Sequence, residues 1–292
     1  MRILVFGAGG MLGHKLMQVL KESHQVFGTV RSDALSPEVS RILGVPHIAT
    51  SVFIEDAAAV RRALETVRPD VVINAVGIIK QLPDSKNVIT TLTVNSIFPH
   101  RLAELAGELG FRLLTVSTDC VFSGSRGNYS EADSPDATDL YGKSKNLGEV
   151  VAENCLTLRT SIIGHELGTS HSLVDWFLSN QGGKVKGFAN AVYSGFPTVV
   201  FAGIIDSLIR HHPRLFGLYH LSSEPISKYD LLRLIDERYQ PNIEIERSED
   251  FRIDRSLDST RFRSETDFTP KSWPEMIDLM AADARIYGKW KQ

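Results

Sequence analysis

Three residues near the middle of the chain have the types and spacing needed for proton transfer. Tyr141 and Lys145 are four residues apart, so both side chains lie on one face of an α-helix with about 3.6 residues per turn. The unperturbed pKa of a phenol is about 10, and a neighbouring ammonium group is expected to lower it. Thr118 offers a hydroxyl that can hydrogen-bond a carbonyl oxygen. These side chains suit reduction of a ketone, with Tyr141 as the proton donor.

The beginning of the chain predicts a dinucleotide site. Residues 2–6 are a short apolar run, typical of a buried strand, and Gly7-Ala8-Gly9-Gly10-Met11-Leu12-Gly13 follows it directly. Apolar residues recur at helical spacing after the glycines. Strand, glycine turn and helix make the arrangement in which a pyrophosphate meets a helix N-terminus. The glycines at 7, 10 and 13 depart from the Gly-x-Gly-x-x-Gly fingerprint, so a plain strand-to-helix turn is the alternative.

The choice of cofactor depends on the end of the second predicted strand. Arg31 offers a charged fork suited to a 2′-phosphate, whereas an acidic side chain there would favour the ribose of NAD. Asp33, two residues later, keeps NADH as the second option. We therefore expect NADPH, with a solvated surface arginine as the alternative for Arg31.

Alternating strands and helices fill the first half of the chain. We expect strands near 2–6, 25–30, 46–50, 70–74, 111–117 and 156–160, and helices near 11–22, 56–67, 88–109 and 140–153. This alternation predicts an α/β fold with a doubly wound parallel sheet. Beyond residue 160 the alternation weakens.

Short segments that carry a family resemblance are spread over most of the chain. They are the glycine turn at 7–13, Asn74-Ala75-Val76-Gly77, Thr93-Val94-Asn95, Ser117-Thr118-Asp119 with Val121-Phe122, Tyr141-Gly142-Lys143-Ser144-Lys145, Leu158-Arg159-Thr160-Ser161, Pro197-Thr198 and Gly217-Leu218-Tyr219-His220-Leu221. Together these segments resemble the extended short-chain dehydrogenase/reductase family, and within it the dTDP-4-dehydrorhamnose reductases.

The resemblance implies a Rossmann-type sheet with a smaller, discontinuous C-terminal substrate domain. Residues 1–160 and roughly 197–224 would form the dinucleotide-binding domain, and roughly 161–196 and 225–292 the nucleotide-sugar-binding domain. The implied activity is NAD(P)H-dependent reduction of the 4-keto group of a nucleotide-activated 4-keto-6-deoxyhexose, in activated-sugar biosynthesis for surface polysaccharide. Lys145 would also contact the nicotinamide ribose.

Further site residues follow from the same resemblance. Asn74, with Ala75 and Gly77 in its motif, and Asn95 would position the cofactor, although side-chain capping explains both asparagines equally well. Pro197-Thr198 would lie near the sugar nucleotide, or Thr198 would simply cap a helix.

Cys120 departs from the pattern of the rhamnose-type reductases, which usually have tyrosine after Ser-Thr-Asp. Asp119 precedes it, but with no adjacent glutamate a dehydratase lacks its base. GDP-fucose synthases, which epimerise and then reduce, have cysteine there and pair it with a later histidine, and Ser170-His171-Ser172 is similar to that segment. A bifunctional epimerase/reductase using Cys120 and His171 is therefore the first alternative. The second is a non-catalytic regulatory subunit, because the regulatory subunit of eukaryotic methionine adenosyltransferase resembles this family.

Composition excludes several classes of protein. The chain has 292 residues and a net charge of −3, so it has no basic footprint for nucleic acid. No apolar stretch approaches the roughly 20 residues that span a bilayer. With only two cysteines we expect no disulfide framework and a cytoplasmic location. The histidines lack metal-ligand spacing, since a zincin pairing of His165 would need histidine where Thr169 stands, so we expect no catalytic metal. The nucleotide, the sugar and its C2 substituent stay open, as does the oligomeric state, including a homodimer.

Overall fold

The computed structural model describes residues 1–291, with the side chains of residues 83, 84 and 289–291 outside the description. Within this part of the chain, a seven-stranded sheet has the order β10-β6-β5-β4-β1-β2-β3, and its paired strands are all parallel. The strands are β1 (Arg2–Phe6), β2 (Gln25–Thr29), β3 (Ile48–Ala49), β4 (Val71–Asn74), β5 (Arg112–Thr118), β6 (Cys155–Thr160) and β10 (Gly217–His220). The predicted doubly wound parallel sheet is confirmed.

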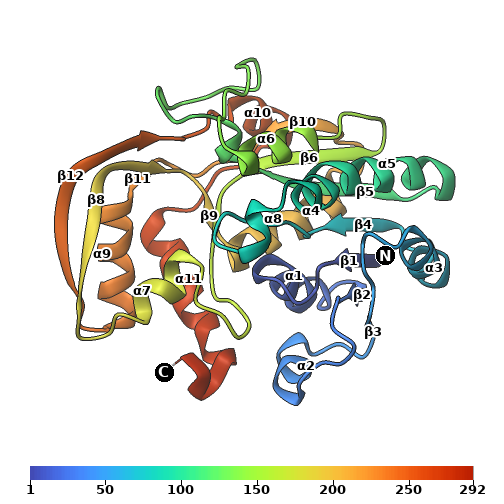
Figure 1. Ribbon diagram of the computed structural model, residues 1–292, viewed down its shortest axis with the longest axis horizontal. Helices are drawn as coiled ribbons and strands as arrows, with labels where there is room; N and C mark the ends of the chain where they lie inside the picture. Colours follow the sequence, from blue (N-terminus) through green and yellow to red (C-terminus); the bar gives the residue numbers. More distant parts are fainter. Residues whose placement is uncertain (292) are drawn as a thin grey trace.

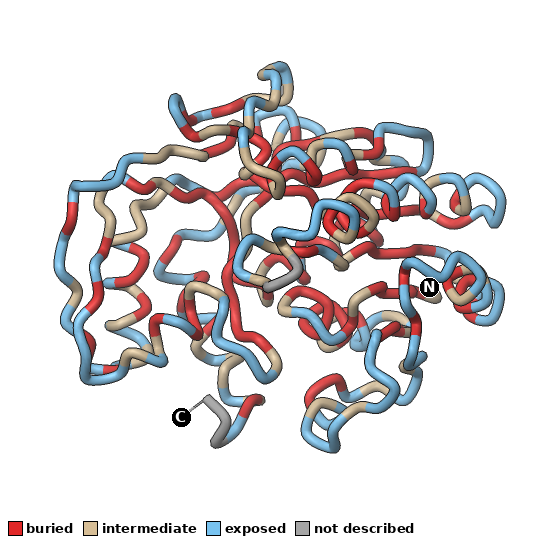
Figure 2. The backbone as a smooth tube through the Cα atoms, viewed as in Figure 1, coloured by how far each residue is buried: buried red, intermediate tan, exposed pale blue. Residues whose placement is uncertain are grey.

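Helices cover both faces of this sheet (Figure 1). They are α1 (Met11–Leu20), α2 (Pro37–Leu43), α3 (Ala57–Val67), α4 (Val88–Leu92), α5 (Phe98–Leu109), α6 (Leu140–Leu147) and α8 (Thr198–His211). Apolar side chains of α1 and α8 pack in one core cluster, and those of α3 and α5 pack in a second. Figure 2 shows the sheet strands as the most continuous buried part of the backbone. The strands carry runs of buried residues because both faces are covered.

Two smaller sheets lie apart from the large one. One has the order β11-β8-β12, and the other pairs β7 with β9. Their strands are β7 (Ile162–Ile163), β8 (Lys184–Tyr193), β9 (Phe196–Pro197), β11 (Ile226–Ser227) and β12 (Glu244–Asp254), and the accompanying helices are α7 (Leu173–Leu178), α9 (Lys228–Tyr239), α10 (Thr260–Thr266) and α11 (Trp273–Asp283). We propose that these elements form the substrate lobe. Along the chain, residues 217–220 interrupt this proposed lobe and pair with β6 in the large sheet, so the lobe is discontinuous in sequence.

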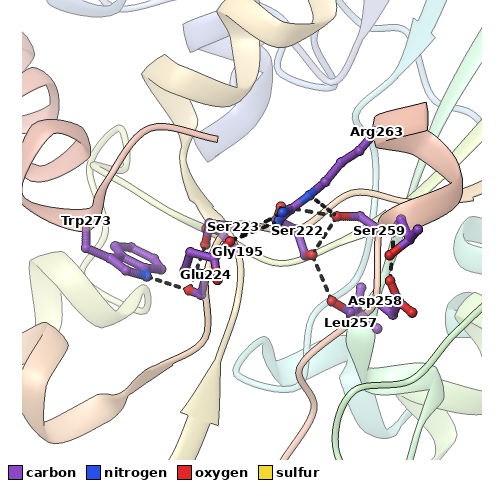
Figure 3. A network of polar contacts seen from close by, with 10 residues as sticks. Gly195, Ser222, Ser223, Glu224, Leu257, Asp258, Ser259, Arg263 and Trp273 are labelled. Atoms are coloured by element: carbon purple, nitrogen blue, oxygen red, sulfur yellow. Dashed lines mark hydrogen bonds and ion pairs between the residues drawn. The ribbon is translucent and has the colours of Figure 1, made fainter. Parts of the chain in front are cut away.

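Polar contacts fasten the segment after β10 to the last third of the chain (Figure 3). The Ser222 hydroxyl donates to the Leu257 carbonyl at 2.8 Å, and the Ser223 hydroxyl donates to the Gly195 carbonyl at 2.7 Å. The Trp273 indole N–H donates to the Glu224 carbonyl at 2.7 Å. The beginning of α11 and the segment before α10 are therefore tied by hydrogen bonds to the chain that follows β10.

Several expected element boundaries differ from the structure. The helix expected at 88–109 contains a π-helical turn at Thr93–Ile97, and the helix expected at 140–153 ends at Leu147. Gly148 follows its last residue and packs so closely on the Asn95 carbonyl that a side chain would collide with it. The strand expected at 46–50 is only Ile48–Ala49, and α2 was not expected. No helix among the described residues is long and apolar enough to cross a bilayer.

Candidate active site

The glycine turn between β1 and α1 brings two stretches of backbone unusually close together. Gly7 has a φ of 86°, in the left-handed region that favours glycine, and its carbonyl accepts the Gly10 N–H at 3.0 Å. A side chain at residue 13 would collide with the same carbonyl. The first turn of α1, from Met11 and the buried Leu12, therefore presents its free N–H groups beside a turn made of three glycines and Ala8. This cradle fits a pyrophosphate.

Arg31 and Asp33 stand just after the end of β2, and both are exposed. β2 lies next to β1 in the sheet, so its carboxyl end is beside the glycine turn. An exposed guanidinium at this edge is free to reach an adenosine 2′-phosphate. The selection of NADPH by Arg31 stays a prediction.

Asn74 ends β4 and is buried. Its side-chain oxygen accepts the N–H of Val76 at 3.2 Å, so it shapes the turn that leads to Gly77. The N–H of Ala75 donates to the Phe6 carbonyl at 3.1 Å, which ties this turn to β1 beside the glycine cradle. The structure therefore gives Asn74 and Ala75 a role in backbone positioning at the expected edge of the sheet.

Asn95 lies in the π-helical turn and is not a helix cap. Its side-chain oxygen accepts the Ile78 N–H at 2.9 Å, and its amide donates to the Ile78 carbonyl at 3.0 Å and to the Ser144 hydroxyl at 3.1 Å. This buried side chain thereby clamps the loop after β4 to α6, which carries Tyr141 and Lys145. π-Helical turns often occur at functional sites.

Thr118 and Tyr141 meet at the carboxyl end of β5. Thr118 is the last residue of β5, and its side chain lies close to the Tyr141 phenol. Burial is the largest effect on Tyr141 and raises the pKa of the phenol, and the nearby Cys120 and Asp119 raise it further. This is opposite to the lowering expected from the lysine spacing. The phenol is therefore protonated at neutral pH.

Lys145 lies one turn after Tyr141 and is buried, with 8% of its surface exposed. Its Nζ donates to the Val116 carbonyl of β5 at 2.7 Å. Burial lowers the pKa of the amine to about 8, and the charge of Glu149 opposes that shift. The lysine is thus held against β5 and titrates close to neutral pH.

Lys80 and Asp139 were not expected from the sequence. Lys80 Nζ lies 5.7 Å from the centre of the Tyr141 ring and donates to Asp139 at 2.8 Å. The other Asp139 oxygen accepts the Gly142 N–H at 2.9 Å and caps α6. An aspartate directly before a helical segment is a recognisable cap signal, but nothing in the sequence connects Lys80 with it.

Asp119 and Cys120 follow Thr118, and Arg255 from the end of β12 reaches them. The Arg255 guanidinium lies 3.6 Å from Cys120 Sγ and donates to the Phe122 carbonyl at 2.8 Å. Burial raises the pKa of Asp119, and the Arg255 charge opposes this. Burial, reinforced by Asp119, raises the pKa of the Cys120 thiol to about 12, so the thiol is protonated at neutral pH. Arg255 was missed because it lies 135 residues from Cys120.

The remaining predicted substrate residues lie in other surroundings. His171 is exposed in the loop before α7, and its N–H donates to Glu166 at 2.7 Å. The charged side chains that act on the Cys120 thiol in the described structure are Asp119, Arg255 and Lys80. Pro197 ends β9, and the buried Thr198 begins α8 without capping it. Roles for His171, Pro197 and Thr198 therefore stay predictions.

No group of three or more histidine, cysteine, aspartate or glutamate side chains among the described residues is arranged to hold a metal ion. The two cysteines are free.

Comparison with known families agrees with this geometry. The model of the RmlD substrate binding domain matches residues 1–285. The chain belongs to this family. The RmlD match begins before β1 and extends through α11, so it includes both the large sheet and the proposed substrate lobe.

The relatives of this RmlD-family chain include reductases and subunits of another enzyme. A dTDP-4-dehydrorhamnose reductase of Aggregatibacter actinomycetemcomitans is 28% identical over 81% of this chain and 79% of its own length. The methionine adenosyltransferase 2 subunit beta of Xenopus tropicalis is 26% identical over 95% of this chain and 80% of its own length. A Bacillus anthracis dTDP-4-dehydrorhamnose reductase solved in complex with NADP shares the fold, with a TM-score of 0.80 at 20% identity over 97% of this chain and 99% of its own.

Proposed function

We propose that this chain reduces the 4-keto group of a nucleotide-activated 4-keto-6-deoxyhexose with NADPH, with NADH as the second option. The product would serve activated-sugar biosynthesis for surface polysaccharide. The observation that carries the proposal is the meeting of Thr118, Tyr141 and Lys145 at the end of β5, on the same sheet edge as the glycine cradle. The family match and the reductase relative support it.

Each side chain has a separate role in the proposed reduction. The glycine cradle would hold the pyrophosphate of the dinucleotide, whose nicotinamide would supply the hydride for the carbonyl carbon. Thr118 and Tyr141 hydrogen-bond the carbonyl oxygen and stabilise the negative charge that develops there. Tyr141 then donates its proton to that oxygen, which completes the hydroxyl. Lys145 provides a nearby positive charge that favours the transient phenolate.

The test is NADPH consumption by the purified protein with keto-sugars linked to dTDP, UDP and GDP. We expect stoichiometric conversion of NADPH and keto-sugar to NADP and hydroxy-sugar with one nucleotide preferred. The absence of turnover with every keto-sugar would contradict the proposal. The same samples, measured by light scattering, distinguish a homodimer from a monomer.

The epimerase/reductase alternative requires Cys120 or its partner to abstract a proton beside the ketone. A thiol with a pKa near 12 is protonated at neutral pH and is a poor base, which supports plain reduction. Incubation with keto-sugar and oxidised cofactor in deuterated water decides between the two. Deuterium at C3 or C5 that is lost in Cys120→Ser would establish epimerisation.

A non-catalytic role is the other alternative, because one relative is named as a subunit of methionine adenosyltransferase. Association with a protein partner in a fixed ratio, without keto-sugar turnover, would favour that role. We place the protein in the cytoplasm on the basis of its free cysteines. Fractionation of the source cells tests this location.

A further inference from the structure

Behind the proposed catalytic lysine lies a buried ion pair that the reaction as described does not use. Glu149 and Arg159 have side chains that are only 6% and 4% exposed. The guanidinium donates from Nε and Nη2 to the two carboxylate oxygens, each at 2.7 Å. The Ser117 hydroxyl donates to one of these oxygens at 2.6 Å. Two-pronged pairing of this kind fixes both the position and the charge of the carboxylate.

The far side of Arg159 is fixed as well. Its Nη1 lies 3.1 Å from Nε2 of His220, and Nδ1 of His220 lies 2.9 Å from the Tyr129 carbonyl. A carbonyl only accepts, so Nδ1 carries the proton and Nε2 accepts from the guanidinium. Burial lowers the pKa of His220, which agrees with a neutral ring. The Phe122 ring lies 5.2 Å from the centre of the guanidinium. Arg159 is therefore held on every side and cannot leave Glu149 without cost.

Glu149 also faces the site. It lies just beyond the end of α6, and adjacent residues of β5 bind the two groups: the Val116 carbonyl accepts from the Lys145 amine, and the Ser117 hydroxyl donates to Glu149. The charge of Glu149 raises the pKa of Lys145 against burial. On the β5 side, the amine donates a hydrogen bond to the uncharged Val116 carbonyl. From β6 comes Arg159, whose charge is paired with Glu149, and from its own helix comes the neutral Tyr141.

We propose that Glu149 is a positioning residue that keeps the Lys145 amine charged and oriented, with Ser117, Arg159 and His220 holding Glu149 in place. The proposal rests on the proposed function, because it concerns the charge that Lys145 carries during the reaction. A purely structural role would have Glu149 only tie the end of α6 to β5 and β6. The two roles differ in what happens to the Lys145 titration.

The test follows Lys145 directly, in the absence of substrate. Protein containing lysine labelled with ¹³C at Cε is titrated by NMR, and the Lys145 signal is assigned with Lys145→Arg. We expect Glu149→Gln to lower the titration midpoint of Lys145 by about one unit, since an opposite charge close by shifts a pKa by roughly 1–3 units. Glu149→Asp, which keeps the charge, is expected to restore most of the midpoint. Glu153→Gln, at an exposed carboxylate four residues later, is expected to leave it unchanged.

Glu149→Gln leaves Arg159 buried without its partner, so the variant is expected to have a lower Tm. If it does not fold, the double variant Glu149→Gln/Arg159→Gln removes both charges and is expected to show the same lowered midpoint. A folded variant of either kind with an unchanged Lys145 midpoint would overturn the proposal. If the protein reduces no keto-sugar but the midpoint shifts, the positioning stands and the proposed function fails, so the two failures are distinguishable.

Discussion

The two ends of the candidate site differ in how they are built. At the β5–α6 end, Thr118, Asp119 and Lys145 are each less than one-tenth exposed and are surrounded by hydrogen bonds. At the β1–β2 end, the cradle is bare backbone, and Arg31 and Asp33 stand in solvent. Burial strengthens electrostatic effects, and solvent screens them. Changes at the first end should therefore affect the chemical step strongly, and changes at the second should affect cofactor affinity moderately.

The largest effect is expected from Tyr141→Phe. Loss of the phenol removes the proton donor, so kcat should fall by roughly 10²- to 10⁴-fold. NADPH affinity, measured by fluorescence titration, should be nearly unchanged. Tyr229→Phe, at a tyrosine of α9 in the proposed substrate lobe, is the matched control. Near-normal turnover in Tyr141→Phe would remove the distinction between the two ends.

Lys145→Met should lower kcat by roughly 10²-fold and also change how stability depends on pH. The Lys145 pKa is about 8 in the folded protein and 10.5 as a free side chain, so the unfolded chain binds more protons between these values. The stability of the wild type therefore rises with pH across this window. The variant lacks this gain. The free energy of unfolding in urea should therefore rise more for the wild type than for the variant from about pH 8 to about 10.5. Lys143→Met, at an exposed lysine, should follow the wild type.

Gly13→Ala tests the close packing of the cradle. The added methyl group collides with the Gly7 carbonyl, so we expect a loss of about 1–3 kcal/mol in stability together with weaker NADPH binding. Gly107→Ala in α5 adds the same group where no atom lies within contact distance, and it should be neutral or stabilise by about 0.5–1 kcal/mol. Equal thermal stability of the two variants would show that the collision is relieved without cost.

The smallest effect is expected from Arg31→Ala. An exposed guanidinium on a 2′-phosphate should contribute about 1.4 kcal/mol, so the Kd of NADPH should rise about tenfold while that of NADH barely changes. Arg62→Ala, at another exposed arginine, should change neither. If NADPH and NADH lose affinity equally, Arg31 is an ordinary surface residue.

Local patterns predicted the parts of the fold whose contacts are local. β1, the glycine turn and α1 follow one another within 20 residues, and the structure has them where the sequence places them. The helix α2 was also predictable, because Ser36 and Pro37 are a typical cap and first helical residue, and Ser36 does accept the Val39 N–H. The close packing of Gly148 on the Asn95 carbonyl was not predictable, since it joins segments more than 50 residues apart.

For the site, residue types were predictable and their environments were not. The spacing of Tyr141 and Lys145 indicated a shared face, and they share one. The direction of the Tyr141 pKa shift depends on burial and on the neighbours Cys120 and Asp119, which only the folded chain specifies. Arg255 and Lys80 reach the site from distant segments, and no periodicity marks either one.

The place of β10 in the large sheet has a consequence for synthesis of the chain on the ribosome. β6 pairs with β5 on one side and with β10 on the other, but β10 is translated 56 residues after β6 ends. Until residues 217–220 emerge, β6 is an open edge with unpaired N–H and carbonyl groups, and Arg159 lacks His220. A nascent chain of this length is open to pairing with other chains, as unpaired edges generally are. Chains truncated before residue 217 should therefore aggregate, whereas chains that include β10 can close the sheet.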